Sequence, residues 1–400
     1  MNKADFSDSP TGTLVPTISN QWAFVPNPLP PEIEYAAIAV PLAQAMQAIG
    51  ELNAAGRSLS NPMLVIRPLQ RREALLSSSM EGTYTTADAL ALAESDKAAK
   101  VDASTIEVRN YIDAFEAANE MRQTLPISSR MIREIHRILL ADVPSERGAN
   151  KRPGEFKDQQ NFIGGRNRQI ENARFVPPPP SQAEDAMAEL ERYLNREDIG
   201  IVPPIVDAAL FHYQFETIHP FADGNGRVGR ILIPIYLMEK GVLDSPLLYL
   251  SPAVEGHKDD YVDLMLGVSQ HGEWTAWLLF FLEMVVKACK AANETLADLE
   301  ALRQKFRQDV SDSGGSARYL TLIDELFVSP VVTIPDVARK LSVTYPAAKN
   351  AVDRLVEQSV LDEHHIISHP RRFISWPIVD LSEGRKPAPL PEIDLGELDL

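Results

Sequence analysis

The sequence contains a single cysteine, Cys289, among its 400 residues. One thiol cannot form an internal disulfide, which excludes a small disulfide-stabilised secreted fold and fits a reducing cytoplasm. The residues around it, from Val285 to Ala291, are mostly apolar and suit one face of a helix. We therefore expect Cys289 to pack in a core rather than to act as a nucleophile.

Long apolar runs are also missing, since the best candidate, Trp277 to Val286, is about half the length needed to span a membrane. The N-terminus lacks the charged and then apolar stretch of a signal peptide. Basic residues are outnumbered, with 39 Lys and Arg against 56 Asp and Glu and a net charge of −17. We therefore expect a cytoplasmic protein that neither coats nucleic acid nor adheres to membranes, although a local DNA-binding surface stays open.

The sequence does contain a dense cluster of chemically active residues over 219–230, HPFADGNGRVGR. Apolar residues at helical spacing precede it over 204–218, and an apolar run follows over 231–240, so we expect a loop between two helices. A Walker loop is excluded because Gly-Lys-Ser/Thr is absent, and a dinucleotide fold because helix rather than strand precedes the glycines. Arg227, at the fifth position, excludes a calcium loop.

The second half of this cluster suits a bound anion. Gly224, Asn225 and Gly226 tolerate a left-handed backbone and can turn several N–H groups toward one surface at a helix N-terminus. Arg227 and Arg230 lie three residues apart on the first helical turn, where both guanidinium groups can reach a polyphosphate.

The first half supplies a base and a metal ligand. Asp223 is a hard oxygen ligand beside the expected anion, which suits Mg²⁺ shared with phosphates. His219 is the group here that exchanges a proton near neutral pH. Each feature alone has an ordinary explanation, such as a core histidine or a turn, but together they predict phosphoryl or nucleotidyl transfer.

The cluster resembles the signature H-P-F-x-D/E-G-N-G-R-x-x-R of Fic-domain proteins, with every fixed position filled. The resemblance implies an all-α fold, made of a Fic helical core with a short β-hairpin flap, and transfer of AMP from ATP to a protein hydroxyl. It makes His219 the general base and Asp223 the Mg²⁺ ligand. The nucleotide-binding positions that it implies are Asp223, Gly224, Asn225, Gly226, Arg227, Val228, Gly229 and Arg230, with both arginines at the β- and γ-phosphates.

A second, shorter pattern follows a helix expected over 69–80. Ser77, Glu81 and Gly82 fit S/T-x-x-x-E-G/N, the inhibitory pattern of the Fic family. A carboxylate at Glu81 could form a bidentate ion pair with Arg230 and occupy the space of the γ-phosphate. The resemblance therefore implies that the chain inhibits itself, the alternative being a solvated glutamate near a C-cap glycine.

Residues 151–165 break the helical pattern, and their glycines predict a hairpin with its tip at 166–169. Together with the prolines at 177–180 they resemble the Fic flap, whose edge can bind a target protein by strand addition. We expect Ile163 to clamp that target and Gly164 and Gly165 to lie near the nucleotide, with an ordinary surface hairpin as the alternative.

Tyr261 lies in a segment that resembles the adenine pocket of the family but lacks its paired tyrosines. We expect Tyr261 either to contact nucleotide or to pack in the core. Elsewhere, residues 1–20 are expected to be loose and 22–31 to be extended, because the prolines of the latter disfavour helix. Further helices are expected over 34–55, within 84–100, and over 105–122, 128–140, 181–194 and 274–307.

A C-terminal module over 319–376 is expected to be a winged helix-turn-helix, with helices at 333–341 and 345–358 and a wing at 366–375. Its acidic and basic residues balance, so a protein dock is favoured over DNA, which requires phosphate neutralisation. The expected organisation is an N-terminal helical region over 1–110, a Fic core over 111–308, a flexible linker over 311–316, a winged helix over 318–376 and a disordered acidic tail over 377–400.

The function that we expect is an ATP- and Mg²⁺-dependent protein adenylyltransferase. Its partner is a target protein, and self-modification and a homodimer are kept as alternatives. A competing hypothesis is a DNA-binding transcriptional regulator whose Fic core senses nucleotide. A toxin without built-in inhibition is disfavoured by Glu81, while a different nucleotide donor and removal of AMP stay open.

Overall fold

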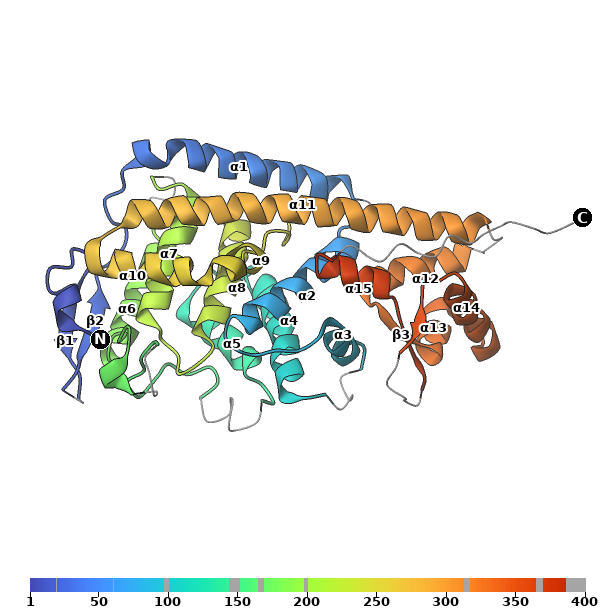
Figure 1. Ribbon diagram of the computed structural model, residues 1–400, viewed down its shortest axis with the longest axis horizontal. Helices are drawn as coiled ribbons and strands as arrows, with labels where there is room; N and C mark the ends of the chain where they lie inside the picture. Colours follow the sequence, from blue (N-terminus) through green and yellow to red (C-terminus); the bar gives the residue numbers. More distant parts are fainter. Residues whose placement is uncertain are drawn as a thin grey trace, which may run out of the picture. The chain divides into compact units, whose positions relative to one another are not determined.

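The computed structural model describes residues 1–18, 20–59, 61–96, 101–143, 152–164, 169–197, 201–312, 317–364 and 370–385. These residues are mostly helical, and the chain divides into two compact units (Figure 1). The first unit comprises Met1–Ser60, Glu73–Thr85 and Val101–Ala292, and the second Asn61–Arg72, Thr86–Lys100 and Asn293–Leu400. Helices α2 (Met63–Ser79) and α11 (Trp274–Asp312) contribute residues to both. The sequence-based domain boundaries stay a prediction.

The N-terminus is ordered, so the expectation of a loose segment over 1–20 is wrong. A 3₁₀ helix η1 (Lys3–Phe6) precedes strands β1 (Gly12–Pro16) and β2 (Trp22–Pro26), which pair antiparallel with Gly12 opposite Pro26. Phe6 packs with Phe24 and Phe175, and the Thr11 hydroxyl donates to the Val268 carbonyl at 2.8 Å. These partners are distant in sequence, which is why local composition did not reveal the hairpin.

The remaining elements of the first unit are helical. They are α1 (Tyr35–Ser58), α4 (Ala103–Met121), α5 (Ser129–Leu139), η4 (Ile170–Asn172), α6 (Pro180–Leu194), α7 (Pro204–Ile218), α8 (Asn225–Glu239), α9 (Ser251–Val254), η5 (Glu255–His257) and α10 (Lys258–His271). Helices α7 and α8 pack side by side (Figure 1), and nearly every residue of both is buried. Because they are buried on all faces, these two helices form the core of the unit.

Helix α8 begins at Asn225, because Gly224 takes a left-handed φ of 77° and caps it. Another helix starts earlier than expected. Helix α2 begins at Met63 rather than Leu69 and continues through Pro68, since Leu64, Val65 and Ile66 are buried.

The expected flap hairpin is represented by one antiparallel bridge, between Ile163 and Phe175. Ile163 N–H donates to the Phe175 carbonyl at 2.8 Å, and Phe175 N–H donates back at 3.1 Å. Gly165 and most of the expected tip lie outside the described residues.

The second unit contains α3 (Ala87–Ser95), α12 (Ala317–Val328), β3 (Val331–Thr333), α13 (Ile334–Leu341), α14 (Tyr345–Glu357), β4 (Asp362–Glu363), β5 (Arg372–Ile374) and α15 (Trp376–Ser382). Its antiparallel sheet has the order β3-β5-β4, with Val331 opposite Ile374. The described residues thus contain two small sheets, so the fold is mostly helical rather than all-α. The helices expected over 333–341 and 345–358 are present as α13 and α14.

The expected disordered tail is wrong at its start. Residues up to Ser382 form α15, because Ile378, Val379 and Leu381 are buried and a proline suits the first turn. The rest of the tail from residue 386, the linker residues 313–316 and the wing residues 366–369 lie outside the described residues.

Cys289 is buried in α11, and burial raises the pKa of its thiol to about 12. This confirms a packing role.

None of the described helices combines the length and the apolar character that a membrane span requires.

Candidate active site

His219 follows the last residue of α7 and takes a left-handed conformation, with φ 48° and ψ 59°. Its Nδ1 lies 3.2 Å from the Glu216 carbonyl oxygen, which can only accept, so Nδ1 carries the proton and Nε2 keeps a lone pair. Burial, assisted by the Lys157 ammonium, lowers the pKa of His219 to about 4. The imidazole is therefore neutral at pH 7, and its Nε2 can accept a proton.

The loop between α7 and α8 is held by its own side chains. Asp223 Oδ1 accepts the Gly224 N–H at 2.6 Å. The Asn225 amide bonds to both backbone groups of Phe221, at 2.8 Å and 2.9 Å. The side chain of Asn225 thus fixes the loop, while the N–H groups of the first α8 turn have no acceptor within the helix and suit an anion.

His136 of α5 lies beneath this loop. Its ring stacks on Phe221 with centroids 3.8 Å apart. Nδ1 accepts the Gly154 N–H at 2.9 Å, so Nε2 carries the proton and donates to the Asp223 carbonyl at 3.0 Å. Burial lowers the pKa of His136 to about 4, so the ring is neutral and both bonds persist at pH 7.

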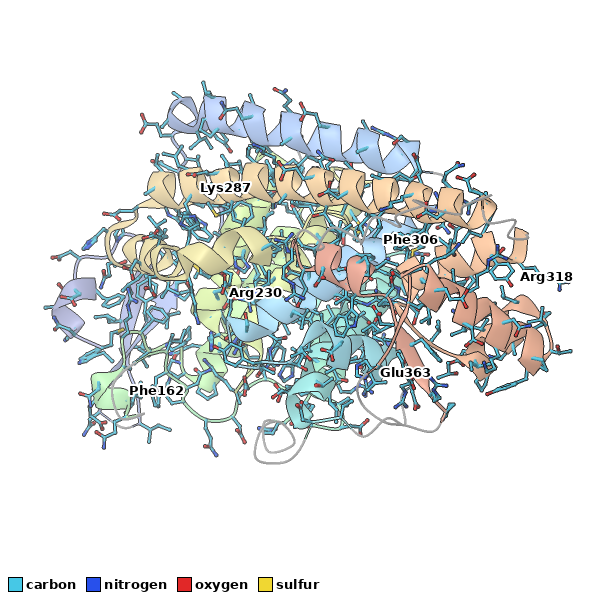
Figure 2. All side chains as sticks on the ribbon, turned by 45° about the vertical axis from the view of Figure 1, so that its right-hand side comes forward. Phe162, Arg230, Lys287, Phe306, Arg318 and Glu363 are labelled. Atoms are coloured by element: carbon cyan, nitrogen blue, oxygen red, sulfur yellow. The ribbon has the colours of Figure 1, made fainter. Side chains whose placement is uncertain are left out.

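Arg230 projects from α8 among the helices of the first unit (Figure 2). Its Nη2 donates to Glu81 Oε1 at 2.7 Å and to the Ser77 carbonyl at 2.8 Å, and its Nε donates to Ser77 Oγ at 2.7 Å. The guanidinium is thus shared between Glu81 and Ser77 rather than bidentate on the carboxylate. Burial opposes ionisation of Glu81, but Arg230 outweighs it, so the pKa of Glu81 lies below its usual value.

Two glycines of α8 make room for carboxyl groups. A Cβ atom on Gly226 would lie 2.2 Å from Glu81 Oε1, and one on Gly229 would lie 2.3 Å from Glu216 Oε1. Burial raises the pKa of Glu216 to about 8, against the opposing effect of Arg230. At pH 7, Glu216 therefore holds a proton while Glu81 is ionised.

Arg227 forms a buried ion pair with Glu107 of α4, with Nη1 3.0 Å from Oε2. The Thr83 hydroxyl donates to the same Glu107 oxygen at 3.1 Å. Asp223 lies 3.5 Å from Nη2 of Arg227. Arg227 therefore ties the loop to α4 and to the segment just after Glu81.

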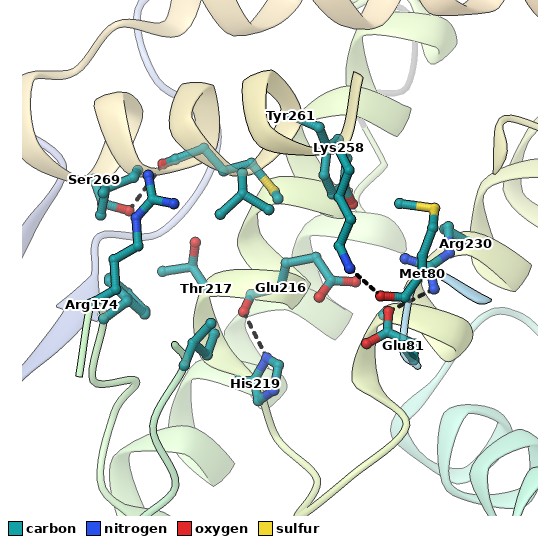
Figure 3. A pocket seen from close by; sticks show the side chains of 16 residues that line it. Met80, Glu81, Arg174, Glu216, Thr217, His219, Arg230, Lys258, Tyr261 and Ser269 are labelled. Atoms are coloured by element: carbon teal, nitrogen blue, oxygen red, sulfur yellow. Dashed lines mark hydrogen bonds and ion pairs between the residues drawn. The ribbon is translucent and has the colours of Figure 1, made fainter. Parts of the chain in front are cut away.

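A cavity of about 230 Å³ brings part of the predicted site together (Figure 3). Its lining includes Glu81, Ile163, His219, Gly226, Arg230 and Tyr261 of the predicted residues. Tyr261 also packs on Trp277, and its hydroxyl lies 2.5 Å from His212 Nε2, so it serves both the core and the cavity. Figure 3 also shows Lys258, whose ammonium donates to the Met80 carbonyl beside Glu81.

The other predicted residues lie around this cavity. Asp223 and Gly224 lie in the adjoining loop, Asn225 and Arg227 lie in the first turn of α8, and Val228 is fully buried. Ser77 lies behind Arg230, while Gly82 and Gly164 take left-handed φ values of 81° and 64°. Gly165 is not among the described residues.

Sequence reasoning missed several residues that shape the site, namely Glu107, His136, Lys157, Asn161 and Glu216. Lys157 and Asn161 are four residues apart in a stretch read only as a hairpin. Other polar side chains surround them in this stretch, so the sequence carries no signal that singles them out.

In the part of the chain that the structure describes, no cluster of three or more His, Cys, Asp or Glu side chains could hold a metal by itself. A metal at Asp223 would thus depend on ligands from the nucleotide.

The family described as Fic/DOC family matches residues 126–237, and the one described as Fic/DOC family N-terminal matches residues 40–120. Protein adenylyltransferase Fic of Drosophila erecta is 34% identical over 171 residues, which are 41% of this chain and 31% of that protein. The alignment thus spans about a third of the length of this relative.

Among solved structures, a Fic family protein from Desulfovibrio desulfuricans superposes with a TM-score of 0.54 and 19% identity, covering 87% of this chain and 98% of the other. A Fic domain-containing signalling protein from Bacteroides thetaiotaomicron gives a TM-score of 0.50 and 20% identity, covering 62% and 97%. These similarities extend the match to the fold.

Proposed function

Because residues 126–237 match the Fic/DOC family and residues 40–120 match its N-terminal region, we propose that the protein transfers AMP from ATP to a protein hydroxyl. The observation that carries the proposal is one cavity lined by a neutral histidine, the first turn of α8 and a buried arginine. The curated relative named protein adenylyltransferase supports the same reaction.

His219 acts as the general base in this proposal. Its Nε2 takes the proton of a Ser, Thr or Tyr hydroxyl, and the freed oxygen attacks the α-phosphorus of ATP. The bond from the α-phosphorus to the oxygen that bridges to the β-phosphate breaks, and diphosphate leaves. N–H groups at the start of α8 and the guanidinium of Arg230 stabilise the phosphate charge.

Asp223 is the residue that would hold Mg²⁺. Its side chain is 40% exposed, and the bond from Gly224 N–H orients the carboxylate at the loop. A single protein carboxylate fits Mg²⁺, which usually keeps waters and takes its other ligands from substrate phosphates. When bound, the ion supplies charge neutralisation at the phosphates.

Glu81 inhibits the reaction in this proposal. Its carboxylate occupies one of the donors that Arg230 would offer to a γ-phosphate, and Ser77 occupies others. ATP then binds with its α-phosphate displaced from attack. The same carboxylate could align a water that removes AMP.

The target protein docks, in this proposal, along the segment that contains Ile163. Backbone groups near a bridge such as Ile163–Phe175 are suited to strand addition, and Ile163 itself lines the cavity. A hydroxyl of the chain itself is the alternative acceptor.

The C-terminal region is, we propose, a winged helix that docks a protein. The succession of α12, β3, α13, α14 and a β4–β5 pair supports the winged helix. Four of its basic side chains already pair with carboxylates of the same unit, namely Arg339 with Asp336, Lys340 with Glu325, Lys349 with Asp353 and Arg371 with Glu363. DNA phosphates would have to displace these partners.

The buried single thiol of Cys289 supports a cytoplasmic location.

The test uses the full chain carrying Glu81→Gly, which removes the proposed inhibition, with Mg²⁺ and ATP labelled at either the α- or the γ-phosphate, in the presence of cell lysate. Label should reach protein from the α-position, and mass spectrometry should find AMP on a Ser, Thr or Tyr. His219→Ala should abolish the signal, and Asp223→Asn should raise the Mg²⁺ concentration required. Transfer from the γ-position above that of the lysate alone, or undiminished transfer by His219→Ala, would contradict the proposal.

A further inference from the structure

The backbone around His219 is held from outside its own helices. Four successive carbonyl oxygens, those of Ile218, His219, Pro220 and Phe221, each accept a hydrogen bond from Lys157 or Asn161. Lys157 Nζ donates to Ile218 at 3.2 Å, and its backbone N–H donates to Pro220 at 2.8 Å. The Asn161 amide donates to His219 and to Phe221, both at 3.0 Å.

This stretch depends on such donors. Helix α7 ends at Ile218, so the carbonyls of its last turn and of the residues beyond have no helical partner. His219 also takes a left-handed conformation that residues other than glycine adopt only when neighbours impose it. The two donor residues impose it by fixing the carbonyl groups on both sides of the histidine.

Lys157 also orients Asn161. Its Nζ donates to Asn161 Oδ1 at 2.7 Å, so the oxygen of that amide faces the amine and the NH₂ group must face the carbonyls. The amine keeps at least two N–H groups in either protonation state, and both of its acceptors are neutral oxygens. The hold on the backbone therefore survives loss of its charge.

The charge of Lys157 acts on the imidazole directly. Lys157 is 5% exposed, and burial lowers its pKa to about 7. Its ammonium lowers the pKa of His219, whereas the Glu81 carboxylate raises it. The cation is thus present below about pH 7, in the range where an ordinary histidine begins to take up a proton.

We propose that Lys157 and Asn161 are positioning residues for His219. Together they set the backbone of 218–221 so that Nδ1 bonds to the Glu216 carbonyl and Nε2 is left open, and the Lys157 cation keeps the ring unprotonated. This role deepens the proposed function and rests on His219 being the general base.

The kinetic test compares full-length chains that carry Glu81→Gly, so that activity is measurable. Lys157→Met and Asn161→Ala should each lower kcat for AMP transfer on the order of 100-fold, with KM for ATP nearly unchanged, because the base is misplaced while the phosphate site persists. Lys157→Met should also move the acid limb of the pH profile upward by roughly one pH unit. Lys157→Arg and Asn161→Ala keep the cation and should leave that limb in place, and Lys287→Met, at an exposed lysine, should change nothing.

A second measurement does not need activity. NMR of isotope-labelled histidine, assigned with His219→Gln, should show Nε2 of His219 unprotonated in the parent protein and protonated at a higher pH in Lys157→Met. If AMP transfer is absent from every variant, the proposed function fails while this measurement still decides the role of Lys157. Two results would overturn the proposal. One is an unchanged pKa of His219 in Lys157→Met. The other is a set of variants, Lys287→Met included, that all lower kcat and change the KM for ATP to the same extent.

Discussion

Oε1 of Glu81 lies 2.7 Å from Nη2 of Arg230, and it fills the space that a Cβ atom on Gly226 would need. The side chain of Glu81 is 35% exposed, whereas that of Arg230 is 4% exposed. The arginine is therefore fixed in the core of the site, and the glutamate is the member of the pair that can leave.

Replacing Glu81 with glycine should increase AMP transfer on the order of tenfold or more, because an ion pair of even 1.4 kcal/mol favours the blocked state tenfold. Glu81→Gln keeps the shape and an acceptor but loses the charge, so its rate should lie between those of the parent and Glu81→Gly. Initial rates with α-labelled ATP measure both. An unchanged rate in Glu81→Gly would remove the case for inhibition.

Breaking the buried pair of Arg227 and Glu107 should destabilise the protein. Glu107→Gln leaves the guanidinium without its charge partner, and a cost of about 3–5 kcal/mol in the free energy of unfolding is expected. Arg227→Met combined with Glu107→Leu should cost much less, since no uncompensated charge is left buried. Urea unfolding measures these values, and Glu134→Gln, in an exposed pair with Arg137, is the control expected to change stability by well under about 1 kcal/mol.

Gly229→Ala should force the Glu216 carboxyl away from α8. The added Cβ atom would lie 2.3 Å from Glu216 Oε1, and such overpacking costs about 1–3 kcal/mol. Gly50→Ala is the matched control, because Gly50 lies within α1 and a Cβ atom there meets nothing within 4 Å. That control should stabilise the protein by up to about 1 kcal/mol. Thermal unfolding of both variants makes the comparison, and equal effects would contradict this account of Gly229.

Stability should fall on acidification, in part through His212. Burial, reinforced by Arg230, lowers the pKa of His212 to about 3 from the usual value of 6.5. The unfolded chain therefore binds a proton at this residue that the folded chain refuses, so its contribution is complete above pH 6.5 and is lost as pH falls toward about 3.

Between pH 7.5 and pH 5 this one histidine should account for a loss of about 2 kcal/mol. His212→Gln should show a smaller difference in unfolding free energy between the two pH values, whereas His271→Gln, at an exposed position, should match the parent protein. An equal difference in all three proteins would refute the assignment.

The sequence predicted the parts of this fold that depend on local pattern. Apolar residues at helical spacing predicted α7, and the helix-turn-helix pattern predicted α13 and α14. The motif over 219–230 placed His219 and Arg230 in one cavity because both lie at the ends of packed helices.

What the sequence could not predict are pairings between distant residues. Arg227 was read as a phosphate ligand, but its buried partner Glu107 lies 120 positions away. The β1–β2 hairpin depends on Thr11 meeting a carbonyl 257 positions later. Lys157 and Asn161 act on a loop about 60 residues further along, and nothing in their own stretch distinguishes them from surface polar residues.

The division of α2 between two compact units bears on how this protein can be shortened. Ending the chain at Ala292 would remove the carbonyl of Val328 from Arg71, which holds it at 2.5 Å. It would also deprive Asp88 of His364 and Asp96 of Arg372. These groups, each of which would lose one partner, lie on both sides, along the chain, of the segment that bears Ser77 and Glu81. Removing the C-terminal region would therefore remove contacts of the residues that flank this segment. The basal rate of a shortened protein would then depend on how firmly Glu81 is held as well as on the residues around His219.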